Sequence, residues 1–295
     1  MQTKALIILN PNSGLKQGKK YLSDILQIFC EANWACEVYI TSKSGDAKAV
    51  VEDRGSGVDV VVCVGGDGTF NEVVSGVISA GIDVSIGYIP SGSTNDFASS
   101  LKLPKNMLTA AKNIVKGSVK TFDACDFNGR TFTYVASFGA FTKASYATPQ
   151  NINNALGHLA YILGGIIEIG KIKPITLKLN VDGDVVEGDF IFGAICNSTS
   201  LGGVLTLDKN VVDMNDGLFE ILLIKSPKNI TELNECILAL TTQNYDSKML
   251  YFTSCSNVEI KLGKSIEWSL DGEYEKGSKN IKITNLHDAI KLILK

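Results

Sequence analysis

The stretch of residues 58–76, VDVVVCVGGDGTFNEVVSG, constrains this chain more than any other. An apolar run ends at the glycine-rich turn of residues 65–69 and an amphipathic segment follows, which predicts a strand, a turn and a helix start. Glycine allows positive φ and lets a bulky anion approach the backbone. The following helix offers free N–H groups and its positive dipole end to a phosphate. The turn predicts a phosphate site, with an ordinary strand-to-helix turn as the alternative.

Length and composition indicate a globular protein of two domains. The chain has 295 residues, of which 45% are hydrophobic and 20% charged. The formal net charge is −3 and the pI is near 5.5, and basic residues do not alternate with aromatic ones. These features argue against nucleic acid as a partner.

The cysteines and the N-terminus predict a cytoplasmic, soluble protein. The 7 cysteines include no C-x-x-C pair and mostly lie in apolar runs, so we expect buried, reduced thiols. The apolar block near the N-terminus is too short for a signal peptide, and no run reaches the roughly 18 to 20 apolar residues of a membrane span.

Apolar runs alternate with helical patterns over the first 120 residues. The expected strands are residues 5–9, 37–41, 58–64 and 84–89, and the expected helices are residues 17–32, 46–54, 70–79 and 105–115. Continuous apolar strands separated by helices are typical of a doubly wound parallel sheet covered on both faces.

The pattern changes after about residue 122, where strand-like runs follow one another across Asn-Gly and Asp-Gly turns at residues 128–129 and 182–183. Further strands are expected at residues 249–253, 257–262, 266–270, 279–284 and 289–294, and helices at residues 156–169 and 227–241. We therefore expect an α/β domain over residues 1–122 and an antiparallel β domain over residues 123–295, with a return of the final residues to the first domain left open.

Polar loops follow the four strands of the first domain. They are residues 10–14, Thr41, the glycine turn and residues 90–96. The carboxyl ends of parallel strands meet at one edge of the sheet, where ligands bind. Each loop alone is explained by turn chemistry, but together they indicate a nucleotide site, in which Asp67 and Asp96 suit a magnesium network.

Seven motifs, in order along nearly the whole chain, carry a family resemblance. They are NPNSG at residues 10–14, GGDGTFNEVVSG at 65–76, PSGSTNDFA at 90–98, SFGAF at 137–141, LGHLAY at 156–161, DMNDGLFE at 213–220 and DGE at 271–273. The chain resembles the diacylglycerol kinase catalytic-domain superfamily, and in it the soluble bacterial lipid kinases related to diacylglycerol kinase B. GGDGT is shared with NAD kinases, whereas P-x-G-S-x-N-D and the late DGE are more specific. One departure is Asn215, where the family often has an acidic residue.

The resemblance implies a phosphofructokinase-like, Rossmann-like α/β domain followed by a C-terminal antiparallel β-sandwich. It implies an ATP- and Mg²⁺-dependent lipid kinase acting on diacylglycerol or a related lipid, at the inner face of the cell membrane. The residues that would hold ATP are Asn10, Pro11, Asn12, Ser13, Gly14, Thr41, Gly65, Gly66, Asp67, Gly68, Thr69, Asn71, Glu72, Ser93, Thr94, Asn95 and Asp96.

The resemblance also implies roles for residues of the second domain. Asp271 would be the general base, and Glu273 would share its face if the strand of residues 266–270 continues through both. The Asp271-Gly272 pair is otherwise a hairpin turn. Asp213, Asp216 and the main-chain carbonyl of Leu218 would form a structural magnesium site of hard oxygen ligands.

Other hypotheses remain open at this stage. A NAD kinase is one alternative, and a non-catalytic nucleotide- or lipid-binding protein on a kinase scaffold is another. Lysines around residues 102–120 would suit anionic headgroups or simply a solvated helix. An exposed strand edge would allow a homodimer.

Overall fold

The computed structural model describes residues 2–14, 16–139, 173–201 and 205–295. The chain divides into two compact units: residues 1–124 together with 288–295 form unit 1, and residues 125–287 form unit 2. Two strands, β5 (Ser118–Phe127) and β17 (Asn280–Leu294), each run from one unit into the other. The last residues of the chain therefore belong to unit 1.

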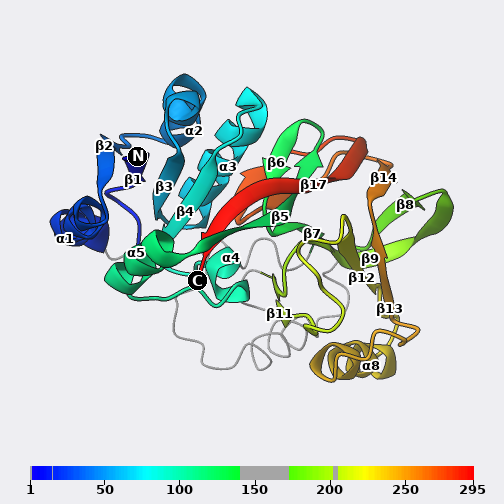
Figure 1. The fold of residues 1–295 in the computed structure, drawn as a ribbon. Coiled ribbons are helices and arrows are strands. Elements are labelled where there is room, and N and C mark those ends of the chain that lie inside the picture. Colours follow the sequence, from blue (N-terminus) through cyan, green and yellow to red (C-terminus); the bar gives the residue numbers. More distant parts are fainter. Residues whose placement is uncertain (1, 15, 140–172, 202–204) are drawn as a thin grey trace. The chain divides into compact units, whose positions relative to one another are not determined.

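Unit 1 contains a parallel sheet, as the alternating pattern predicts (Figure 1). Its strands lie in the order β4–β3–β1–β2, and β17 pairs with β4 through Leu292 and Ile86. The bounds are β1 (Thr3–Leu9), β2 (Trp34–Ile40), β3 (Val60–Gly65) and β4 (Ser85–Pro90). Strands β1, β3 and β4 are almost wholly buried, which is why they appear in the sequence as continuous apolar runs.

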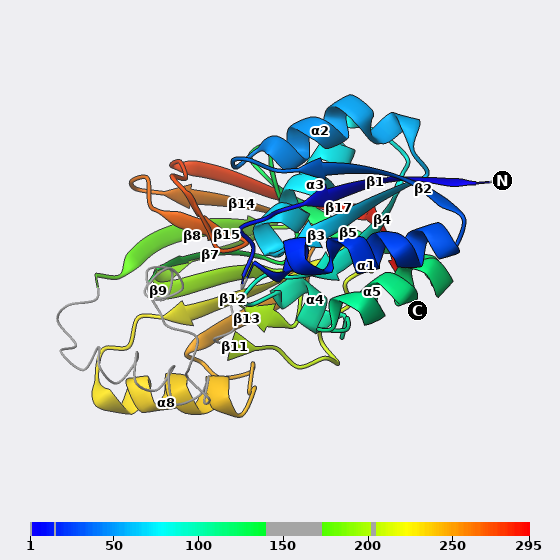
Figure 2. The same ribbon diagram turned by 90° about the vertical axis from the view of Figure 1, so that its left-hand side faces the viewer.

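Helices cover both faces of this sheet (Figure 2). Helices α1 (Gln17–Glu31) and α5 (Met107–Lys116) share one apolar cluster with β1 and β3. Ile25 and Phe29, four residues apart on α1, point into that cluster because i and i+4 share a helix face. Helices α2 (Asp46–Arg54) and α3 (Asp67–Ala80) pack together on the other face.

The helix after the glycine turn begins earlier than expected, at Asp67 rather than at residue 70. Asp67, Gly68 and Thr69 form its first turn, where N–H groups have no partner within the helix and a glycine costs little. A short helix that the sequence did not reveal, α4 (Asp96–Ser100), follows β4, and a 3₁₀ turn, η1 (Gly55–Gly57), follows α2.

Unit 2 is built from antiparallel pairs around the 13-residue strand β9 (Asp184–Cys196). It pairs with β8 (Ile175–Val181), β7 (Val135–Gly139) and β12 (Phe219–Lys225). The other elements are β6 (Arg130–Phe132), β10 (Ser200–Leu201), β11 (Leu205–Thr206), α8 (Ile230–Thr241), β13 (Leu250–Cys255), β14 (Asn257–Leu262), β15 (Trp268–Leu270) and β16 (Glu273–Glu275). The predicted antiparallel domain is confirmed.

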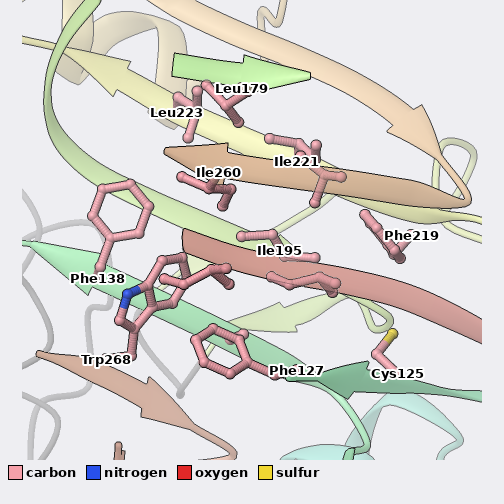
Figure 3. Packing of buried hydrophobic residues seen from close by; sticks show 14 of the residues in the cluster. Cys125, Phe127, Phe138, Leu179, Ile195, Phe219, Ile221, Leu223, Ile260 and Trp268 are labelled. Atoms are coloured by element: carbon pink, nitrogen blue, oxygen red, sulfur yellow. The ribbon is translucent and has the colours of Figure 1, made fainter. Parts of the chain in front are cut away.

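Aromatic side chains fill the core of unit 2 (Figure 3). The ring centroid of Trp268 lies 5.0 Å from that of Phe127, in an edge-to-face arrangement, and 4.7 Å from that of Phe138, in a tilted one; aromatic pairs favour such geometries over face-to-face stacking. Ile195, Ile221 and neighbouring apolar side chains complete the cluster.

The expectation of two separate strands at the C-terminus needs correction. The predicted strands at residues 279–284 and 289–294 are one strand, β17. Asp288 lies within it at φ 56°, and its N–H donates to Asp123 Oδ1 over 3.0 Å. A polar residue in the left-handed region interrupts the apolar alternation without ending the strand, so the sequence pattern showed two pieces.

One predicted helix, at residues 156–169, lies outside the described residues. Within the described part of the chain, no helix is long and apolar enough to cross a membrane. All seven cysteines are free, and five are buried, but Cys30 is exposed.

Candidate active site

Three loops of unit 1 meet where β1, β3 and β4 end. They are residues 10–14, 65–69 and 91–96. Asn10 Nδ2 donates to Thr69 Oγ1 over 2.8 Å, and the Ser91 N–H donates to the Gly65 carbonyl oxygen over 2.8 Å. The fold thus brings together three of the segments that sequence analysis assigned to a nucleotide.

Glycines allow this meeting. A Cβ added to Gly92 would lie 2.6 Å from Gly66 Cα, and a Cβ added to Gly66 would lie 3.0 Å from Gly92 Cα. Gly14, at φ +50°, would press a Cβ against the Ser91 carbonyl oxygen. Any side chain here would push the loops apart, whereas bare backbone also permits the close approach of a phosphate.

Asp67 joins the second loop to the third. Its carboxylate accepts the N–H of Asp96 over 3.1 Å and that of Phe97 over 3.3 Å, at the start of α4. Asn95 stands before this helix at φ 55°, and its side chain bonds both the N–H and the carbonyl of Gly92. The acidic residue therefore holds the N-terminus of α4 beside that of α3.

Thr41 and Asn12 lie close to the first loop. Thr41, at the end of β2, is buried and donates its N–H to the Leu9 carbonyl oxygen over 3.0 Å. The Asn12 N–H donates to Asn10 Oδ1 over 3.0 Å. The predicted residues after β1 and β2 are therefore neighbours.

Glu72, which the family resemblance assigns to the nucleotide, bonds the start of α2. Its carboxylate accepts the N–H of Gly45 over 2.7 Å, the N–H of Ala47 over 3.1 Å and the hydroxyl of Ser44 over 3.2 Å. These donors belong to the N-terminus of α2, which lacks a side-chain cap of its own. Glu72 thus anchors α2 to α3, a role that its place in the motif did not reveal.

A pocket of about 470 Å³ lies beside the third loop. Ser91, Gly92, Ser93, Thr94 and Asn95 form one wall. The other lining residues come from the end of β4, the starts of α1 and α5, α4 and the linker between α4 and α5: Gln17, Pro90, Ala98, Ser99, Lys102, Leu103, Lys105 and Met107. No carboxylate lines it.

Asp271 occupies a hairpin turn of unit 2, which is the second of the two possibilities that the sequence left open. Asp271 and Gly272 have φ of 48° and 81° and connect β15 to β16, as Asp-Gly does in type I′ hairpins. The carboxylate is 5% exposed and accepts four hydrogen bonds. They come from the N–H groups of Thr133 (2.6 Å), Tyr134 (3.0 Å) and Val135 (3.0 Å) and from the Thr133 hydroxyl (2.8 Å).

Burial and hydrogen bonding act in opposite directions on the pKa of Asp271. Burial raises it above the usual range, and the hydrogen bonds from Thr133, Tyr134 and Val135 oppose that rise. A carboxylate has about four lone-pair positions, so these donors match its capacity.

Glu273 does not share a face with Asp271 because the turn separates them. Its side chain is 48% exposed, and Oε2 accepts a bond from Arg130 Nη2 over 2.7 Å. Arg130 also bonds Glu275 Oε2 over 2.7 Å. The predicted carboxylate dyad is thus replaced by one buried acid and one exposed, ion-paired acid. The only sequence signal for Arg130 was its place after a hairpin turn.

The residues implied for magnesium lie in one loop of unit 2. Asp213 Oδ1 accepts the Asn215 N–H over 3.0 Å, and Asp216 Oδ1 accepts the Leu218 N–H over 2.9 Å. The Leu218 carbonyl oxygen accepts Asn285 Nδ2 over 2.8 Å. Among the described residues, no three His, Cys, Asp or Glu side chains gather closely enough to hold a metal.

Sequence analysis missed Glu220, which is buried at 1% exposure on β12. Ser254 Oγ donates to its Oε1 over 3.3 Å. Burial, followed by the negative charges of Asp216 and Asp213, raises the pKa of Glu220 to about 8. An acid inside the apolar run FEILLIK was the available signal.

Two family models match the chain. The diacylglycerol kinase catalytic domain matches residues 4–127. The YegS C-terminal NAD kinase beta sandwich-like domain matches residues 135–294. The two models together define the class: a diacylglycerol kinase-type catalytic domain followed by a β-sandwich-like domain.

Relatives of known name agree with this class. The chain is 30% identical to a diacylglycerol kinase of Bacillus subtilis (strain 168) over 92% of this chain and 90% of that protein. It is also 30% identical to a diacylglycerol kinase of Staphylococcus aureus (strain MRSA252), over 93% and 87% of the two chains.

Solved structures share the fold. A Bacillus anthracis str. Sterne structure, assigned to the diacylglycerol kinases, has a TM-score of 0.82 and 26% identity, covering 99% of this chain and 97% of that one. A second structure from that organism has a TM-score of 0.77 at 24% identity over the same shares. The chain belongs to the diacylglycerol kinase family of lipid kinases, so the family and fold predicted from the motifs are confirmed.

The contacts of Glu72 yield a test of its anchoring role. Glu72→Ala should lower the free energy of unfolding by about 2 kcal/mol, because two N–H groups and a hydroxyl at the start of α2 lose their acceptor. Urea denaturation followed by circular dichroism measures this change. Glu31→Ala, which removes an exposed bond to Gln27, is the control and should cost less than about 0.5 kcal/mol. Equal effects would contradict the anchoring role.

Proposed function

We propose that the chain transfers the γ-phosphate of ATP to a hydroxyl of diacylglycerol or a related membrane lipid. The observation that carries this proposal is the meeting of the three loops of unit 1 at backbone distance, next to the starts of α3 and α4. Phosphoryl transfer depends mainly on positioning the phosphates and offsetting their charge. Backbone N–H groups and helix N-termini supply both. The names of the relatives support a lipid acceptor.

In this proposal the loops divide the nucleotide between them. The first loop, Thr41 and the polar side chains of residues 93–95 bind it, while residues 65–69 approach the phosphates. Asp67 and Asp96 hold the loops in register and present carboxylates to a cation-bound phosphate. Glu72 contributes through the α2 anchor rather than by direct contact.

We place Mg²⁺ with Asp213, Asp216 and the Leu218 carbonyl. Their chemistry fits, since all three offer hard oxygens and only one oxygen of each carboxylate takes part in the turns described above. When bound, the ion would supply positive charge and order in this loop. Buried Glu220, whose pKa is raised to about 8, is mostly neutral at pH 7 and so adds little negative charge to this loop.

The two acids of the DGE motif have different roles in this proposal. A general base must accept a hydrogen bond from the attacking hydroxyl, but four donors already match the acceptor capacity of Asp271. We assign Asp271 as a positioning residue that locks the β15–β16 hairpin to residues 133–135. Glu273, exposed and oriented by Arg130, then accepts the hydroxyl proton late in a loose transition state.

Because such an acceptor lipid resides in a bilayer, we also propose that the protein works at a membrane surface. Phosphoryl transfer to the hydroxyl of another lipid would use the same residues.

The first experiment identifies the acceptor. The protein is incubated with γ-labelled ATP, Mg²⁺ and separated lipid classes, in parallel with NAD. We expect label in diacylglycerol or another hydroxyl lipid, at a rate at least 100-fold above that of Glu273→Gln, since a general base contributes about 10² or more. Label in NAD alone would select a NAD kinase, and label in nothing would favour a non-catalytic binding protein.

The second experiment separates the roles of the two acids. Glu273→Gln should lower kcat by about 100-fold or more with no change in Tm and little change in the KM for ATP. Asp271→Asn presents an amide group to four donors, so it should lower Tm by several degrees. The pH dependence of its remaining kcat should keep the wild-type shape, because Glu273 is intact.

The opposite pattern would contradict this division of roles. An Asp271→Asn protein with unchanged Tm and no turnover, together with an active Glu273→Gln protein, would make Asp271 the base.

A further inference from the structure

Three aromatic rings pack together below the loop edge of unit 1, where the loops of residues 10–14, 65–69 and 91–96 meet. Phe70 belongs to the first turn of α3, Phe97 is the second residue of α4, and Tyr88 comes from β4. The ring centroid of Phe70 lies 4.4 Å from that of Tyr88 and 4.6 Å from that of Phe97. All three side chains are buried. The cluster therefore joins the sheet to the two helix starts beside the proposed phosphate site.

The hydroxyl of Tyr88 is the one polar side-chain group of this cluster. Tyr88 is 2% exposed, and within the part of the chain that the structure describes its Oη has no hydrogen-bond partner. A buried hydroxyl without a partner costs free energy that a phenylalanine in the same place would not. The packing of the ring alone therefore does not explain why this residue is a tyrosine.

The acidic group that acts most strongly on this hydroxyl is Asp67. Burial raises the pKa of Tyr88 well above its usual range, the charge of Asp67 is the next cause, and Cys63 and Asp96 add to it. The hydroxyl therefore keeps its proton and can donate it to a carboxylate. The fold agrees with this proximity, because Asp67 begins the helix turn that stacks Phe70 on the Tyr88 ring.

The bonds between Asp67 and α4 are long for a charged acceptor. The N–H groups of Asp96 and Phe97 lie 3.1 Å and 3.3 Å from its oxygens, whereas charge-assisted bonds are typically about 2.7 to 2.9 Å. Hydrogen bonds at functional sites are often long without a ligand and shorten when it binds. A donor below Asp67 and loosely held donors beside it suit a carboxylate that is fixed only when the site is filled.

We propose that Tyr88 is a positioning residue for the nucleotide, whose hydroxyl donates a hydrogen bond to the Asp67 carboxylate when Mg²⁺-ATP occupies the loop edge. Asp67 is then held from the sheet as well as from α4. The inference rests on the proposed function, because it takes the loop edge as the nucleotide site. It adds to that site a residue that lies outside the loop motifs and does not touch ATP.

Tyr88→Phe removes only the hydroxyl and keeps the ring against Phe70. Because the lost group has no partner in the described residues, Tm should stay the same or rise by about 2 °C. The Kd for Mg²⁺-ATP, measured by isothermal titration calorimetry, should rise about tenfold, since a bond to a charged group is lost. A purely structural hydroxyl would give the reverse: a lower Tm and an unchanged Kd.

Tyr245→Phe is the matched control in unit 2. It makes the same chemical change and also leaves a stacked pair of rings, since the Tyr245 and Phe252 centroids lie 4.2 Å apart. Tyr245 Oη, however, accepts the Asp208 N–H over 3.0 Å. This variant should lower Tm by a few degrees and leave the Kd for Mg²⁺-ATP within about twofold of the wild type.

A double-mutant cycle tests whether Asp67 is the acceptor. In an Asp67→Asn background only a neutral acceptor remains, so Tyr88→Phe should raise the Kd by less than about threefold. In an Asp96→Asn background it should still raise the Kd about tenfold.

Two results would overturn the inference: a Tyr88→Phe protein with the wild-type Kd, or equal effects of Tyr88→Phe in the two backgrounds. None of these measurements involves a lipid. A wild-type protein that shows the expected pattern with Mg²⁺-ATP and phosphorylates no lipid would leave the role of Tyr88 intact and count only against the proposed acceptor. A wild-type protein that binds no Mg²⁺-ATP would contradict the nucleotide site itself, and the role of Tyr88 with it.

Discussion

The close approach of the Gly66 and Gly92 backbones sets the geometry of the loop edge in unit 1. A Cβ added to either glycine would lie 2.6 Å or 3.0 Å from the Cα of the other. Neither residue can therefore carry a side chain unless a main-chain segment moves. Asp67 then extends the contact by capping α4, and Asn10 ties the first loop to Thr69. The loop arrangement that we propose to bind phosphate follows from one backbone contact and the parallel strands that end beside it.

In unit 2, the corresponding constraint is the buried carboxylate of Asp271. Burying a carboxylate costs several kcal/mol unless hydrogen bonds replace its water, and Asp271 meets this condition with four donors from three consecutive residues, Thr133 to Val135. The same contacts make it a poor proton acceptor and a good lock for the hairpin that carries Glu273. In the proposed mechanism, Asp271 therefore positions Glu273 without touching the reacting atoms.

The sequence predicted the parallel sheet, its helices and the antiparallel second unit, because strands such as β3 are apolar throughout and helices such as α1 repeat apolar residues at i and i+4. It placed the loop motifs at one sheet edge for the same reason. It left Asp271 and Glu273 undecided between a continuing strand and an Asp-Gly turn, because the residues before the pair are compatible with both. It did not reveal the contacts of Glu72 with the start of α2 or the burial of Glu220, because both depend on distant segments that no local pattern shows.

Amide hydrogen exchange with and without Mg²⁺-ATP measures the nucleotide assignment most directly. If the loop edge of unit 1 holds the phosphates, exchange at residues 65–69 and at the start of α4 slows on ATP binding, while exchange in α8 is unchanged. ATP binding that leaves both loop segments unprotected, or protects only unit 2, would contradict the assignment.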